Sequence, residues 1–170
     1  MTRPAVRADE EAMSFLARSL MVARRRLLSL STVPRIGVRL LAVSPDEHVL
    51  LVKHTYVSGW HLPGGGLKTG ERADEGAIRE AWEESGHRVG AVDGLLGLYA
   101  NFGVGWSDHV AVYVSRDITA DVDLPVRPPS RLEIAAAAMF NLDELPPDIC
   151  GSSLRRIEEW RGRRPLARDW

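Results

Sequence analysis

The pattern of apolar and polar positions predicts a chain that mixes strands and helices without regular alternation. Four short runs rich in branched aliphatic residues predict strands, at 36–43, 49–54, 95–101 and 109–114. The turn-forming residues 44–47 lie between the first two runs and favour a hairpin. The alanine-rich run 134–141 is compatible with either a helix or a short strand. This mixture indicates an α+β fold.

Helical periodicity occurs in three places, at 9–30, 73–85 and 152–161. The first helix is expected to be amphipathic and basic, with an apolar stripe made by Met13, Leu16, Ala17, Leu20, Leu27 and Leu28. We expect it to pack on the core or on a second subunit, or to touch an anionic membrane or RNA. The expected organisation is a basic helix over 1–34, a central domain over 35–147, and a helix and tail over 148–170 packed on that domain.

Composition narrows the class of protein. The 170 residues suit one domain, and a hydrophobic fraction of 45% is ordinary for a globular protein. Cys150 is the only cysteine, which excludes an intrachain disulfide and a thiolate metal cluster. No apolar run approaches the roughly 20 residues needed to span a bilayer, and no segment resembles a signal peptide. A cytoplasmic location is therefore expected.

Charge is distributed unevenly behind a net value of −1. Residues 36–147 contain nine Lys or Arg and sixteen Asp or Glu, a balance of −7, whereas both ends are basic. An acidic centre disfavours direct binding of nucleic acid or other polyanions there, unless a cation intervenes.

Part of this acidity is concentrated on the helix expected at 73–85. Glu80, Glu83 and Glu84 are three and four residues apart, so their carboxylates share one helical face and repel one another. Taken alone, such a cluster is compatible with a solvated surface. Hard divalent cations offer another explanation, because they bind several carboxylate oxygens at one point. The glycine-rich loop 58–66 precedes this helix and is expected to have no regular structure.

The stretch GGLKTGERADEGAIREAWEESGH over 65–87 resembles the Nudix box, G-x5-E-x7-R-E-U-x-E-E-x-G-U, in which U is a bulky aliphatic residue. Every fixed polar and glycine position matches. Ala81 and His87 depart from the aliphatic positions, which concerns local packing only. The similarity to the Nudix (MutT-like) hydrolase family extends over about 36–147. It implies an α/β/α sandwich around a mixed sheet and hydrolysis of a nucleoside diphosphate linked to another group.

The same resemblance implies roles for individual residues. Glu80, Glu83, Glu84 and the Gly64 carbonyl would hold Mg²⁺, with Mn²⁺ as an alternative. Arg79 would orient the carboxylate of Glu71 or Glu83, although an ordinary helix pair with Glu83 or Glu75 remains open. For the general base we expect Glu133 or, alternatively, Glu80. Glu133 is also compatible with an exposed loop carboxylate or an auxiliary metal ligand.

Substrate recognition is less defined by the sequence. Lys53 and Arg39 lie on predicted strands and could contact phosphate. Trp60 and Trp106 stand beside glycine-rich loops and could stack on a base, although Trp side chains more often pack in a core. The expected partner is a small nucleotide or other diphosphate. Nucleic acid is not expected, apart from an RNA 5′ end, and a homodimer is possible. The competing interpretation is a nucleotide sensor of the same fold without turnover.

Overall fold

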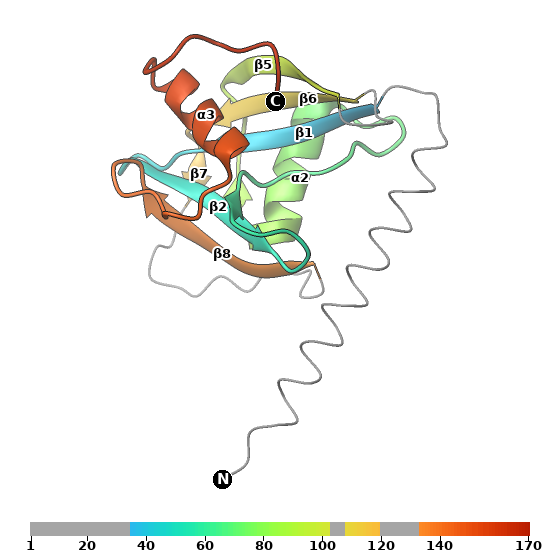
Figure 1. Cartoon of the computed structure of the whole chain (residues 1–170). Coiled ribbons are helices and arrows are strands. Elements are labelled where there is room, and N and C mark those ends of the chain that lie inside the picture. Colours follow the sequence, from blue (N-terminus) through green and yellow to red (C-terminus); the bar gives the residue numbers. More distant parts are fainter. Residues whose placement is uncertain (1–34, 103–107, 120–132) are drawn as a thin grey trace.

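The computed structural model describes residues 35–102, 108–119 and 133–170 (Figure 1). In this part of the chain the strands form three small sheets. The first has the order β1 (Arg35–Ala42), β6 (Asp108–Ser115) and β5 (Gly94–Asn101). β1 runs parallel to β6, whereas β5 runs antiparallel to it. This sheet therefore has the mixed character that the resemblance implies.

The second sheet has the order β3 (Trp60–His61), β2 (His48–His54) and β8 (Ile134–Asn141), all antiparallel. A third, two-stranded ladder joins β4 (Arg88–Val89) to β7 (Ile118–Thr119). The antiparallel bridge between Val43 and Val49 connects the first two sheets where β1 leads into β2.

Two helices enclose the sheets on opposite faces, as Figure 1 shows. Helix α2 (Ala73–Ser85) buries Ala77 and Ala81 against Val38 and Leu40 of β1. On the other face, α3 (Gly151–Trp160) contributes Ile157 to a second core. The buried residues of this core are Leu41, Val43, Val49, Leu51, Leu62, Tyr99, Val110, Val112, Val114, Leu142 and Ile157. The α/β/α sandwich and the α+β class are confirmed.

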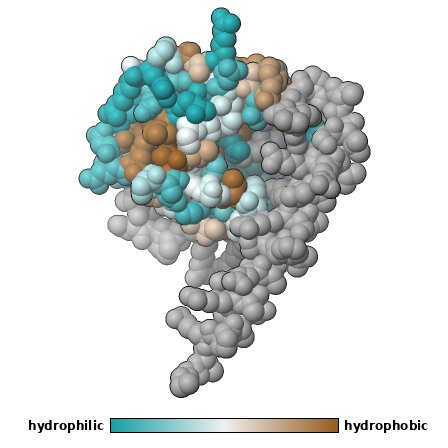
Figure 2. All heavy atoms as spheres, in the orientation of Figure 1, coloured by the Kyte–Doolittle hydropathy of each residue, from teal (hydrophilic) through white to brown (hydrophobic). Residues whose placement is uncertain are grey.

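The tail after α3 returns to the free edge of β5. The N–H of Ala100 donates to the carbonyl of Arg168, and the N–H of Trp170 donates to the carbonyl of Ala100 (Figure 1). The Trp170 ring packs on the core beside Tyr99. Elsewhere, the face shown in Figure 2 is mostly hydrophilic, with small apolar patches. Within the described residues, no helix is long and apolar enough to cross a membrane.

The predicted hairpin between 36–43 and 49–54 is wrong, although both strands exist. The edge of β1 that would face β2 is occupied by the glycine loop instead. The N–H groups of Val38 and Leu40 donate to the carbonyls of Gly65 and Pro63. A single bridge between β1 and β2 is what remains of the expected pairing.

Other expectations changed in detail. The ambiguous run 134–141 is a strand, because it pairs with β2 along its length. The loop 58–66 contains the two-residue strand β3, contrary to the prediction that it has no regular structure. The short strands β4 and β7 were not predicted. The helix expected at 9–30 and residue Trp106 lie outside the described residues.

Candidate functional site

The glycine loop 62–66 lies between β1 and the carboxylate face of α2, and it depends on glycine at two positions. Gly64 has φ of 147°, and a Cβ there would overlap the Val38 carbonyl. A Cβ on Gly65 would lie 2.8 Å from all three carboxylate atoms of Glu80. A side chain at Gly64 would push the loop away from β1, whereas one at Gly65 would displace the Glu80 carboxylate. The close approach brings backbone polar groups to the carboxylates: the Gly64 N–H donates to Glu84 Oε2 at 2.8 Å.

Arg79 links the remaining carboxylates. Its Nε donates to Glu71 Oε1 at 2.6 Å and its Nη2 to Glu71 Oε2 at 2.9 Å, a two-pronged contact. Its Nη1 donates to Glu80 at 2.8 Å and to Glu83 at 3.1 Å. The hydrogen bonds from Arg79 are the main reason why the pKa of Glu71 falls to about 2, with a smaller contribution from the Lys68 N–H. The expected pairing of Arg79 with Glu71 and Glu83 is therefore present.

Glu84 occupies a more buried corner of the site. Burial raises the pKa of Glu84 to about 7, against the opposing effects of the Arg39 charge and the Gly64 N–H. His54 Nδ1 lies 3.9 Å from Glu84 Oε1. Burial, assisted by the charges of Arg39 and His61, lowers the pKa of His54 to about 3. Because both shifts favour the neutral forms, these two side chains do not make a strong ion pair near neutral pH.

Arg39 extends from β1 toward the same corner. Its Nη1 donates a short hydrogen bond to the Gly64 carbonyl and a longer one, 3.4 Å, to the Leu62 carbonyl. A positive group therefore already contacts the carbonyl that was expected to bind a metal. The structure brings Arg39 beside the carboxylates. Its role as a phosphate contact stays a prediction.

The donor set suits a divalent cation, although the carboxylates now have protein partners. Within the described residues, no three acidic, histidine or cysteine side chains converge as a ready metal cluster. Arg79 and Lys68 hold Glu83, and Gly64 holds Glu84. The chemistry nevertheless fits, since carboxylate and carbonyl oxygens are the ligands that Mg²⁺ and Mn²⁺ prefer. The Arg39 guanidinium already places one positive charge at the Gly64 carbonyl.

The other predicted residues differ in how closely they approach this cluster. Glu133 is exposed at the start of β8, yet its charge contributes to the raised pKa of Glu84, so the two carboxylates are within electrostatic reach. Lys53 forms an ion pair with Asp148 at 2.8 Å. Trp60 is half-buried, and its ring meets the edge of Phe140 with centroids 4.7 Å apart. The position of Trp60 therefore favours core packing over an open stacking surface.

The sequence analysis assigned no role to His54 or Lys68, which lie beside Glu84 and Glu83. Among the residues that the structure describes, none forms a hydrogen bond with the buried His54 Nδ1. His54 alternates along the strand with Leu50 and Val52, which could have indicated that its side chain faces inward. A shift in strand register between Lys53 and His54 weakens this indication. His87, which replaces an aliphatic residue of the motif, is also buried, with 6% of its surface exposed. It therefore packs where the family pattern has an apolar side chain.

Comparison with known proteins gives the geometry a family context. The family model described as NUDIX domain matches residues 33–160. A MutT-like protein of Streptomyces ambofaciens is 39% identical over 66 residues, which cover 39% of this chain and 42% of that protein. The m7GpppN-mRNA hydrolase dcap-2 of Caenorhabditis elegans is 32% identical over 124 residues, which cover 69% of this chain and 15% of that protein.

A solved structure supports the same fold. The MutT NUDIX hydrolase from Burkholderia pseudomallei superposes with a TM-score of 0.63 at 24% sequence identity, covering 74% of this chain and 97% of that chain. The chain spans less than half the length of the curated relatives named above. The family model nevertheless extends over most of the sequence, from the start of β1 to the end of α3. The chain therefore belongs to the NUDIX family.

Proposed function

We propose that the chain is a divalent-metal-dependent pyrophosphohydrolase, which cleaves a nucleoside diphosphate linked to another group by attack of water on phosphorus. The observation that carries this proposal is the carboxylate face of α2 against the glycine loop. A Cβ on Gly65 would lie 2.8 Å from the Glu80 carboxylate, and Glu84 accepts a hydrogen bond from Gly64. A purely structural surface would not require three adjacent carboxylates at a glycine-dependent contact.

In this proposal Glu80, Glu83, Glu84 and the Gly64 carbonyl hold Mg²⁺ or Mn²⁺. When bound, the cation neutralises the diphosphate and lowers the pKa of coordinated water. The carboxylates also concentrate negative charge, which a cation would reverse locally where an anionic diphosphate must sit.

Arg79 acts as a positioning residue in this scheme. It bonds Glu71, which is outside the proposed ligand set, and at the same time Glu80 and Glu83, which are inside it. The Glu71 carboxylate also accepts the Lys68 N–H at 2.8 Å, which fixes it to the loop before α2. Such support limits the rotamers of the ligand carboxylates and preserves their geometry between turnovers.

For the general base we propose Glu133, with Glu80 as the alternative. The electrostatic reach of Glu133 to Glu84 supports a place beside the reacting water. Its backbone is also anchored, since the Glu133 carbonyl accepts the Thr55 N–H at 2.9 Å. Glu80 belongs to the cluster itself, but its carboxylate already accepts a hydrogen bond from Arg79 at 2.8 Å.

Substrate contacts are assigned by the charges around the cluster. Arg39 is the stronger candidate for a phosphate contact, because its guanidinium already lies at the Gly64 carbonyl. Lys53 would have to exchange Asp148 for a phosphate oxygen. Trp60 and Trp106 remain proposed base contacts.

A substrate panel tests the activity. The full chain should be incubated with Mg²⁺, with Mn²⁺ and with excess chelator, against nucleoside triphosphates, ADP-ribose, nucleotide sugars, dinucleoside polyphosphates, 5′-triphosphorylated RNA and m7GpppN-capped RNA. The capped RNA is included because dcap-2 is named an mRNA hydrolase. We expect metal-dependent release of phosphate or of a nucleoside monophosphate from at least one compound. Tight binding of one compound without turnover of any would contradict the proposal and favour a sensor.

A further inference from the structure

Helix α2 covers only part of the face of the first sheet on which it packs. Aligned residues cross this face from β1 through β6 to β5. One row is formed by Val38, Ala111 and Leu98, and the next by Leu40, Tyr113 and Leu95. The β1 members are fully buried, whereas Leu98 and Leu95 are 52% and 54% exposed. Burial therefore decreases steadily from β1, where α2 packs, to β5.

The exposed part continues to one end of the sheet. Phe102 follows β5 and is 65% exposed, with its ring edge-on to His109 of β6. Ile36, near the start of β1, pairs with His109 and is 48% exposed. We call Leu95, Leu98, Phe102 and Ile36 the uncovered β5 face. Four large apolar side chains on one side of a sheet form a surface that is normally covered in a folded protein.

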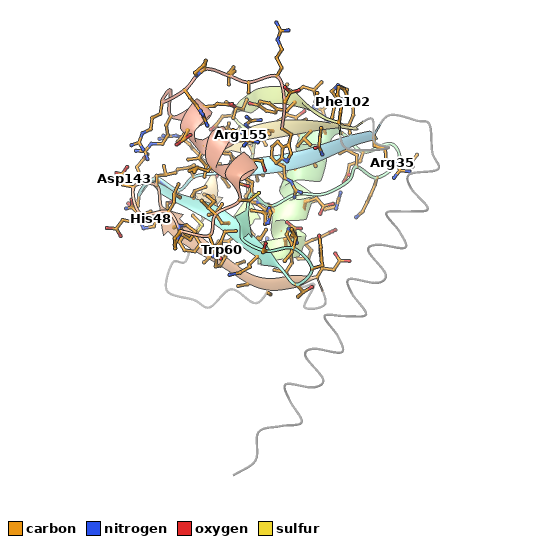
Figure 3. All side chains as sticks on the ribbon, viewed as in Figure 1. Arg35, His48, Trp60, Phe102, Asp143 and Arg155 are labelled. Atoms are coloured by element: carbon orange, nitrogen blue, oxygen red, sulfur yellow. The ribbon has the colours of Figure 1, made fainter. Side chains whose placement is uncertain are left out.

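The end of this face is also where the N-terminal segment joins the domain. Arg35 begins β1 and is aligned with Asp108, which pairs with Asn101 at the end of β5. Figure 3 accordingly shows Arg35 and Phe102 at the same end of the molecule. The 34 residues that precede β1 therefore enter the described domain beside Ile36 and Phe102.

The N-terminal segment has an apolar stripe that suits such a surface, and it is long enough to reach it. Residues 9–30 carry the apolar stripe and the arginines described above. As a helix these 22 residues would be about 33 Å long, and the eight residues of β5 extend about 26 Å. Residues 31–34 can span about 13 Å, and the distance from β1 across β6 to β5 is about 10 Å. The connection is thus long enough to place the helix along β5.

We propose that segment 9–30 docks within the same molecule on the uncovered β5 face, beside α2, with its apolar stripe on Leu95, Leu98 and Phe102. Arg18, Arg25 and Arg26 lie on the other side of such a helix and then face solvent, whereas Arg24 falls within the stripe. The docked segment completes the outer layer that α2 begins. This inference does not depend on the proposed hydrolytic activity.

Limited trypsin digestion of the full chain tests the docking, because Arg24, Arg25 and Arg26 provide cleavage sites inside the segment. Cleavage after these arginines is measured by mass spectrometry at low protein concentration. We expect the Leu95→Glu/Leu98→Glu variant to be cut there roughly tenfold faster than the wild type or more, since proteolysis follows the population of the open form. Leu166→Glu, at another exposed leucine in the C-terminal tail, should leave the rate unchanged.

Variants in the segment provide a second test that leaves the described domain intact. Leu20→Glu on the stripe should increase the cleavage rate as much as the double variant, whereas Ser19→Glu on the polar side should not. Equal cleavage of the wild type, Leu95→Glu/Leu98→Glu and Leu20→Glu would overturn the proposal. Protection that rises with protein concentration, together with a dimer in sedimentation, would assign the face to a second copy instead. Protection that requires anionic vesicles would assign the segment to a membrane.

Discussion

Replacing Gly64 by alanine tests whether the glycine loop holds the carboxylates in place. The φ of 147° at Gly64 belongs to a region that residues with a side chain rarely adopt. An added Cβ would also meet backbone atoms, the Val38 carbonyl and Arg39 Cα, which cannot rotate away as a side chain could. The loop must therefore move away from β1.

The structure allows the size of this effect to be worked out. Backbone strain of this kind costs about 1–3 kcal/mol. Displacement of the loop also weakens two backbone hydrogen bonds, Val38 N–H to Gly65 and Leu40 N–H to Pro63, each contributing about 1 kcal/mol. We expect the free energy of unfolding to fall by about 3–5 kcal/mol. For a chain of this size that corresponds to a decrease in Tm of about 6–20 °C.

Urea denaturation at 25 °C measures this change, and Gly66→Ala is the matched control. Gly66 lies two residues away in the same loop, but a Cβ there would meet nothing within 4 Å. Its variant should unfold within about 0.5 kcal/mol of the wild type, as for a surface substitution. If Gly64→Ala and Gly66→Ala had the same free energy of unfolding, the tight contact between the loop and β1 would be refuted.

Three further predictions follow from buried or shared polar groups. Arg79→Lys should weaken Mn²⁺ binding about 10–100-fold in titration calorimetry, because lysine cannot bridge three carboxylates. The control Arg72→Lys, whose partners are exposed, should bind Mn²⁺ as the wild type does. Burial raises the pKa of Tyr99 from 10.0 to about 12 with help from Glu159, so the unfolded chain loses this proton first. The free energy of unfolding should therefore fall as the pH rises from 10 to 12, and it should fall less in Tyr99→Phe. Denaturant midpoints measured across this pH range check the difference. Arg156→Met should lower the free energy of unfolding by about 3–5 kcal/mol, since the Glu159 carboxylate would be left buried without its 2.7 Å partner.

Local signals in the sequence were sufficient for the helix that carries the site. Helix α2 spans the predicted residues 73–85, and Gly86 ends it in the left-handed conformation, with its N–H bonded to the Trp82 carbonyl. The spacing of Glu80, Glu83 and Glu84 then determines which side of the helix they share. These features depend on residues within a few turns of one another, which is why periodicity predicts them.

Features that depend on distant residues could not be predicted in the same way. The hairpin prediction failed because β1 pairs with β6 and with the glycine loop, partners that the intervening turn does not specify. The alanines of β8 favour helix by propensity, but pairing with β2 overrides that preference. His54 reaches Glu84 from another element, and nothing in the spacing of the motif indicates this approach.

The central claim is that the α2 carboxylates hold the metal that hydrolysis requires, and one comparison of rates tests it directly. The metal-dependent rate of pyrophosphate cleavage should be measured for the wild type, Glu84→Gln and Glu75→Gln, after circular dichroism has established that each is folded. Glu75 lies on the same helix, but its recorded ion pair is with exposed Arg72. If these carboxylates hold the metal, Glu84→Gln should lose at least about 100-fold in kcat, while Glu75→Gln should retain the wild-type rate. Equal rates for all three proteins would contradict this claim.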